Sequence, residues 1–173
     1  MSGSVLIAGI GNIFQGDDAF GVAVAQQLAA LKLPGKVKVM DAGIRSLDLA
    51  FALLNEYDLT ILVDATTRGG APGTLYTIEI QPDNIADGCD QSFIVNSHGL
   101  DPVRVLALAK SMGARLKRVL LVGCEPLVVD HDDSGHIGLS EPVEAAVKPA
   151  IQIVKQLLED FARKEEVFTH EYV

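Results

Sequence analysis

The chain has 173 residues, of which 49% are hydrophobic, and a formal net charge of −9. This length and apolar content suit one domain with a core of ordinary size, and they argue against a disordered chain. The excess of acidic residues argues against nucleic acid or an anionic membrane as a partner, because Lys and Arg are too few to form a broad basic patch.

Five apolar runs rich in Val, Ile and Leu predict β-strands, and several intervening segments have the period of amphipathic helices. Alternation of this kind is typical of an α/β protein. We expect a three-layer sandwich: a five-stranded, mostly parallel twisted sheet with one antiparallel edge strand, and helices on both faces. The predicted elements in chain order are a strand Val5–Ile10, a helix Ala19–Leu31, a strand Val37–Met40, a helix Leu47–Leu54, strands Leu59–Val63 and Leu75–Ile80, a helix Pro102–Met112, a strand Val119–Val122 and a helix from Pro142 to about Arg163.

Polar residues and prolines mark several boundaries of these elements. Asp101 before Pro102 is typical of a helix N-cap, and Ser140 before the last helix repeats the pattern. Pro149 should kink that helix or split it in two, and we expect a kink. Gly69–Gly73 predicts a loop before the antiparallel edge strand, and residues 81–96 are expected to form a mobile loop. We place one domain at residues 1–164 and a frayed tail at 165–173.

The sequence G9-I-G-N-I-F-Q-G-D-D-A-F-G21 lies where the first strand passes into the first helix. It is not a dinucleotide fingerprint, because Phe14 stands where the third Gly is required. Asp17 and Asp18 would also repel a phosphate at the helix N-terminus. One carboxylate is enough to cap a helix, and we assign that role to Asp17. Asp18 is therefore a candidate for chemistry, although a purely structural pair remains an alternative.

Further candidate ligands follow other strands. Asp64 and Asp41 each end a strand, and the carboxyl ends of parallel strands are where ligands bind. Acids gathered there would raise one another's pKa values, which a cation would relieve. His98 precedes another helix, and Asp18, Asp64 and His98 would make an oxygen and nitrogen site suited to Zn²⁺ or Ni²⁺. Taken singly, Asp64 also fits a turn cap and His98 an exposed loop residue.

The remaining features concern location and assembly. Cys89 and Cys124 form no C-x-x-C pair, so neither a disulfide framework nor a thiolate metal site is indicated. We find neither a signal peptide pattern nor an apolar run long enough to span a bilayer. We therefore expect a cytoplasmic protein, and a monomer because no apolar helix face is left over.

Several short motifs, in one order and over nearly the full length, resemble the hydrogenase maturation endopeptidases, which trim the large subunit of nickel–iron hydrogenases. The matching motifs are Gly9-Ile10-Gly11-Asn12, Asp17-Asp18, Gly21, Asp41-x-Gly43, Val63-Asp64-Ala65, Pro72-Gly73-Thr74, Ser97-His98, Gly123-x-x-Pro126 and Ile137-Gly138-Leu139-Ser140.

This resemblance implies a metal site and catalytic centre formed by Asp18, Asp64 and His98, although some relatives have Glu in place of Asp18. It implies removal of a C-terminal peptide from a nickel-loaded large-subunit precursor, by attack of a metal-oriented or metal-activated water. Nickel would arrive with the substrate as the recognition signal, while zinc or another divalent metal could occupy the site in isolation. We expect Asp41, Ile44 and Arg45 to contact the substrate.

Two other functions remain open at this point. A metal-binding assembly chaperone that holds the precursor without cutting it would explain the lack of an evident nucleophile. Neither cysteine has a matched histidine, and Ser97 beside His98 does not make a triad by adjacency alone. Nucleotide binding is the third possibility and is disfavoured by the two acids at the helix start.

Overall fold

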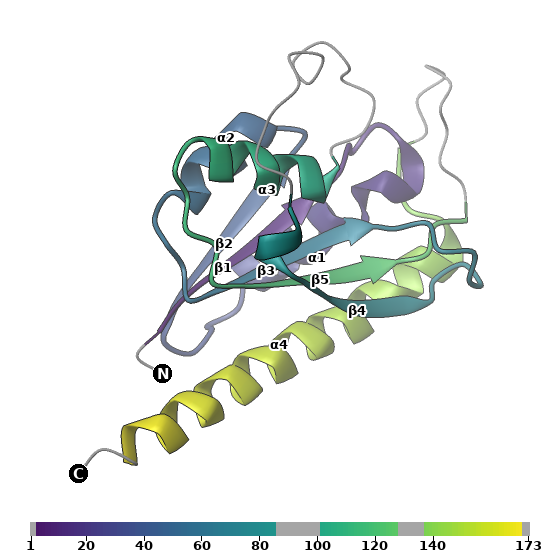
Figure 1. Ribbon diagram of the computed structural model, residues 1–173. Coiled ribbons are helices and arrows are strands. Elements are labelled where there is room, and N and C mark those ends of the chain that lie inside the picture. The colour runs from purple at the N-terminus through teal and green to yellow at the C-terminus, as the bar shows by residue number, and fades with distance from the viewer. Residues whose placement is uncertain (1–2, 86–100, 128–136, 171–173) are drawn as a thin grey trace.

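In the computed structural model, a five-stranded sheet lies between two layers of helices (Figure 1). The structure describes residues 3–85, 101–127 and 137–170, with side chains up to residue 164. The strands are β1 (Ser4–Ile10), β2 (Lys36–Gly43), β3 (Leu59–Ala65), β4 (Leu75–Ile80) and β5 (Arg118–Cys124). The helices are α1 (Phe20–Ala29), α2 (Ser46–Leu53), α3 (Pro102–Ser111) and α4 (Glu141–His170), with 3-10 turns η1 (Gly16–Ala19) and η2 (Pro82–Asn84).

The strand order β2-β1-β3-β5-β4 determines where a ligand can bind. β1 pairs in parallel with β2 and β3, β3 pairs in parallel with β5, and β4 is antiparallel at the edge. The chain leaves β1 for β2 on one side and then crosses to β3 on the other. The carboxyl ends of β1 and β3 therefore flank a topological switch point, which is the usual binding crevice of such sheets.

The core has two parts because alternate residues of a strand face opposite sides of the sheet. Val5 and Ile7 of β1 belong to the apolar cluster that includes α1 and α4, whereas Leu6 and Ala8 belong to the cluster that includes α2 and α3. All four residues are fully buried. The central strands are thus apolar on both faces, as expected for a parallel sheet covered by two helical layers.

Helix α4 runs beneath the sheet from the carboxyl ends of the parallel strands to beyond their amino ends (Figure 1). It is not split at Pro149, and it continues to His170, past the end predicted at about Arg163 and past the domain boundary placed at residue 164. Proline removes only one backbone bond. Val147 and Val154 are buried on either side of it, so packing holds both halves against the same layer.

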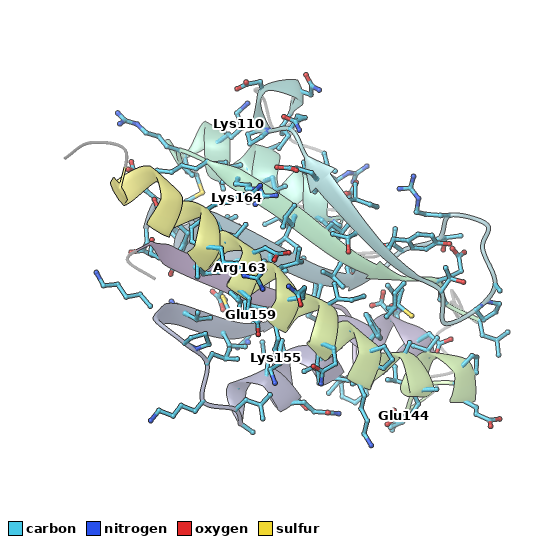
Figure 2. The ribbon with its side chains drawn as sticks, turned by 90° about the horizontal axis from the view of Figure 1, so that it is seen from below. Lys110, Glu144, Lys155, Glu159, Arg163 and Lys164 are labelled. Carbon is cyan, nitrogen blue, oxygen red and sulfur yellow. The ribbon has the colours of Figure 1, made fainter. Side chains whose placement is uncertain are left out.

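The opposite side of α4 is charged. Glu144, Lys155, Glu159 and Arg163, labelled along the helix in Figure 2, are exposed. This two-sided pattern is that of an amphipathic helix on the surface of a globular domain. Among the described residues, no helix combines the length and apolar character needed to cross a membrane.

The predicted fold class is confirmed, including the five strands, the antiparallel edge strand and the helices on both faces. The predicted strand Leu75–Ile80 has the observed bounds of β4, and Asp101 caps α3 by accepting a hydrogen bond from Val103 N at 2.9 Å. Of the loop predicted at 81–96, residues 81–85 include η2, and Lys110 donates hydrogen bonds to the carbonyls of Pro82, in η2, and of Ile85, which follows it. Residues 86–96 lie outside the described residues.

Candidate functional site

The turn after β1 folds back tightly on the strand and thereby aims Asp18. Gly11 has a φ of 133°, a conformation that L side chains rarely adopt, and a Cβ there would lie 1.7 Å from the carbonyl oxygen of Asp18. The amide of Gly11 donates to the Gly43 carbonyl at 3.1 Å, which anchors the turn to the end of β2. Asn12 N donates to Asp18 Oδ2 at 2.5 Å. The Asp18 carboxylate is therefore held close to the end of β1.

Asp64 lies in β3, at the adjacent strand end, and is only 6% exposed. Burial raises its pKa well above the ordinary value, and the negative charge of Asp18 raises it further. Burial also raises the pKa of Asp18, against the opposing effect of the Asn12 hydrogen bond. The two carboxyl groups thus share one electrostatic environment in which ionisation is disfavoured. Such a pair is satisfied by a shared proton or by a cation.

The third predicted ligand, His98, lies outside the described residues, so the set of two carboxylates and one imidazole stays a prediction. Within residues 3–85, 101–127 and 137–164, no three His, Cys, Asp or Glu side chains are grouped so as to hold a metal ion. Asp101, which caps α3 shortly after His98, adds to the charges that raise the pKa of Asp64. The start of α3 is therefore close enough to Asp64 for the two groups to interact.

The predicted substrate residues lie at the end of β2. Asp41 is half-buried, and its Oδ2 accepts a hydrogen bond from Gln26 Nε2 at 3.1 Å. Arg45 folds back to donate to the backbone carbonyls of Asp41 and Ala42, and Ile44 is 64% exposed. Because β1 separates β2 from β3, Asp41 is one strand further from Asp64. Asp101, not Asp41, is the other acid whose charge raises the pKa of Asp64.

Asp17 does not occupy the position that the sequence suggested. Ala19 stands at the N-cap of α1. The Asp17 carboxylate is 1% exposed and accepts hydrogen bonds from Leu127 N at 2.8 Å, Ser140 N at 2.7 Å and Ser140 Oγ at 2.8 Å. Its role as a helix cap is thus a wrong prediction. The side chain instead joins the first turn of the chain to segments on either side of 128–136.

Glu125 is a buried carboxylate that the sequence reasoning missed. It accepts hydrogen bonds from the amides of Arg68 and Gly69 and from the Tyr76 hydroxyl, with the shortest at 2.8 Å. Burial raises the pKa of Glu125, but the hydrogen bonds outweigh it and the net direction is downward. The residue holds the loop that follows Asp64. Its only sequence signal was its place inside the Gly123-x-x-Pro126 motif.

Cys124 is buried, and burial together with the charges of Asp17 and Glu125 raises the pKa of its thiol to about 11. A thiol that stays protonated at neutral pH is a poor nucleophile. The sequence likewise offers Cys124 no matched histidine to activate it. Cys89 lies outside the described residues.

Comparisons of the sequence and of the fold with known proteins both point to one protein family. A family profile described as hydrogenase maturation protease matches residues 22–157. The hydrogenase expression/formation protein HupD of Rhizobium leguminosarum bv. viciae is 32% identical over 155 residues, which cover 89% of this chain and 73% of HupD. The hydrogenase 2 maturation protease of Escherichia coli (strain K12) is 29% identical over 159 residues, covering 90% of this chain and 91% of that protein.

Solved structures show a similar fold. The hydrogenase maturating endopeptidase HybD from E. coli aligns with a TM-score of 0.69 at 27% identity, over 91% of this chain and 93% of its own. A hydrogenase 2 maturation peptidase from Thaumarchaeota archaeon SCGC_AB-539-E09 aligns with a TM-score of 0.67 at 31% identity, over 90% and 98%. The likeness in sequence and the likeness in fold each cover about nine-tenths of the chain.

Proposed function

Because the chain belongs to the hydrogenase maturation protease family and is a peptidase of that family, we propose that it removes a C-terminal extension from a nickel-loaded precursor of a hydrogenase large subunit. The observation that carries this proposal is the pair Asp18 and Asp64 at the switch point of the sheet. Burial disfavours the ionised form of each carboxyl group, and the charge of Asp18 further disfavours that of Asp64. A cation delivered by the substrate would relieve that repulsion.

In this proposal Asp18 and Asp64 bind the nickel of the precursor, and His98 supplies the third ligand. Carboxylate oxygen and imidazole nitrogen are suitable donors for Ni²⁺, and for Zn²⁺ in the isolated protein. A metal held there would polarise the scissile carbonyl or activate a water molecule.

The chain's own residues prepare the site for a cation. The amide of Asn12 keeps Asp18 oriented, because it donates to Oδ2 at 2.5 Å. Burial and the charge of Asp18 disfavour the ionised form of Asp64, and a bound cation would stabilise that form. A precursor without metal offers no such cation. The pair would therefore favour the nickel-loaded precursor over the empty one.

Substrate contacts beyond the metal would come from the rim at the end of β2. Ile44 and Arg45 directly follow β2, with 64% of Ile44 and 59% of the Arg45 side chain exposed. Asp41 lies at the same rim, and its carbonyl accepts a hydrogen bond from Arg45. The apolar Ile44 next to the positively charged Arg45 suits an extended peptide that carries an acidic or carbonyl-rich segment.

The test is cleavage of the authentic large-subunit precursor, prepared with and without nickel and followed by intact-mass spectrometry. We expect loss of a C-terminal peptide only from the nickel-loaded form. Asp18→Asn and Asp64→Asn should each lower kcat/KM by about 100-fold or more, because a ligand of the metal is removed. Asp160→Asn, on the outer side of α4, should leave the rate unchanged. Tight binding without any change in mass would instead support the non-cleaving chaperone and reject the proposed reaction.

A further inference from the structure

We propose that Asp17 is a positioning residue, which keeps the neighbouring Asp18 carboxylate in place by fastening the η1 turn to two distant segments of the chain. The inference rests on the proposed function only in giving Asp18 a part in the reaction. The positioning itself stands on the geometry of Asp17, whose carboxylate is buried and accepts hydrogen bonds from Leu127 and Ser140.

The contacts of Asp17 are of the strong kind. Its two carboxylate oxygens accept hydrogen bonds from Leu127 N, Ser140 N and Ser140 Oγ, all between 2.7 and 2.8 Å. Hydrogen bonds to an ionised acceptor are about twice as strong as neutral ones. Ser140 immediately precedes α4, so the negative charge also lies at the end of a long helix where the helix dipole favours it. Asp17 thus connects the η1 turn to the segment after β5 and to the residue before α4.

Because Asp17 and Asp18 lie in the same η1 turn, anchoring Asp17 also restrains Asp18. In a 3-10 helix successive side chains are rotated by about 120°, so Asp17 can point into the interior while Asp18 points to the rim. Asp18 N donates to Gln15 O at 3.1 Å, and the Asp18 carbonyl lies against Gly11 so closely that a Cβ there would clash at 1.7 Å. The backbone of Asp18 is therefore confined between the end of β1 and the anchored Asp17.

Glu125 provides a matched control, because it is another buried carboxylate that accepts hydrogen bonds from backbone amides and a hydroxyl. Its bonds hold the loop after β3 and do not involve η1. A loss of stability alone should appear in both Asp17→Asn and Glu125→Gln. A displacement of Asp18 should appear only in the first.

The deciding measurement is the amide proton shift of Asn12 in an ¹⁵N–¹H correlation spectrum, because that amide donates to Asp18 Oδ2. In the wild type we expect it far downfield. Asp17→Asn replaces one acceptor oxygen by an NH₂ group, and the Asn12 resonance should move upfield or split. Glu125→Gln should leave it in place. With nickel-loaded precursor, well below the melting temperature of each variant, Asp17→Asn should lower kcat/KM by about 10- to 100-fold, as expected when a group behind a metal ligand is lost.

An Asn12 resonance unchanged in Asp17→Asn, or a displaced resonance with full activity, would overturn the proposal. If Asp17→Asn does not fold, Ser140→Ala carries the test, since it removes only the hydroxyl donor; a smaller upfield shift supports the proposal and no shift rejects it. If the wild type leaves the precursor uncut while the Asn12 shift depends on Asp17, then the proposed reaction fails and the positioning of Asp18 stands.

Discussion

Asp64 is buried, and burial together with the charge of Asp18 outweighs the hydrogen bond from the Ala65 amide that favours its ionised form. A buried charge that is not fully compensated normally destabilises a fold. The protein retains it at the carboxyl end of a central strand, which is where a parallel sheet binds ligands. A buried carboxyl group whose ionised form is disfavoured, at a position where such sheets bind ligands, indicates a functional site.

This leads to a prediction for the metal-free protein in EDTA. The pKa of Asp64 is raised in the folded state, so the folded chain binds a proton more tightly than the unfolded chain. Stability therefore falls as the pH rises from the ordinary carboxyl pKa through the raised one. Asp64→Asn has no such charge and should unfold at a higher temperature than the wild type at pH 7.5, with the gap closing toward pH 4. Greater stability of the wild type at pH 7.5 would contradict this assignment.

Single residues also show what a sequence can and cannot reveal. Asp18 and Asp64 could be selected because each follows a predicted strand, and in a parallel sheet such ends share one edge. The roles of Asp17 and Glu125 could not be selected, because their partners lie 110 and 57 positions away in Leu127 and Arg68. Nothing local distinguishes Asp17 from a helix cap. His98 remains a prediction from its motif.

At the level of elements, the close contact of α1 with the sheet determines where Asp18 and Asp64 lie. A Cβ at Gly21 would lie 2.1 Å from Val63 O and 2.3 Å from Ile10 O. Val63 and Ile10 come from β3 and β1, so one glycine lets the helix approach both strand ends at once. The helix can therefore begin close beneath the switch point.

Gly21→Ala should destabilise the protein by about 1–3 kcal/mol, because the added methyl group forces α1 away from the strands. The direction of the change in stability is diagnostic, since Gly→Ala inside a helix normally stabilises the helix by about 1 kcal/mol. Urea unfolding followed by circular dichroism measures the effect. Gln27→Ala, at an exposed position of the same helix, should change stability by less than about 0.5 kcal/mol. A Gly21→Ala variant as stable as the wild type would show that the contact can relax.

Most elements could be predicted because their apolar periods are strong, as in β4. The ends that were missed depend on tertiary contacts. β2 extends to Gly43 because it continues to pair with β1 through a register shift at Ile10. α4 passes Pro149 because its buried face continues on both sides, and the polar sequence beyond Arg163 carried no signal for the length of the helix.

For the whole molecule, the sheet separates two apolar layers that must fold together. Leu158 of α4 belongs to one cluster and Leu106 of α3 to the other, and both are essentially inaccessible to solvent. The central strands contribute side chains to both layers. The strand order that creates this arrangement could not be read from the sequence, since alternating strands and helices fit several orders.

Leu158→Ala and Leu106→Ala should each lower the free energy of unfolding by about 2–5 kcal/mol. Because the leucines lie on opposite faces of the sheet, the double variant should show the sum to within about 0.5 kcal/mol. Far-ultraviolet circular dichroism and tyrosine fluorescence should give one coincident transition for each variant. The exposed Gln156→Ala serves as the neutral control. Two separate transitions would show that the layers unfold independently.

The tight turn between β1 and α1 lowers the entropic cost of binding a cation at Asp18. Asp18 is bonded to Asn12, and its backbone is closed in by Gly11. The rotational freedom of that carboxylate is therefore lost when the chain folds and not when a ligand arrives. Ordering a rotamer-rich side chain during association costs about 0.5–1.5 kcal/mol. An incoming cation meets an oxygen that is already immobilised, so less of its intrinsic affinity is consumed by ordering the protein.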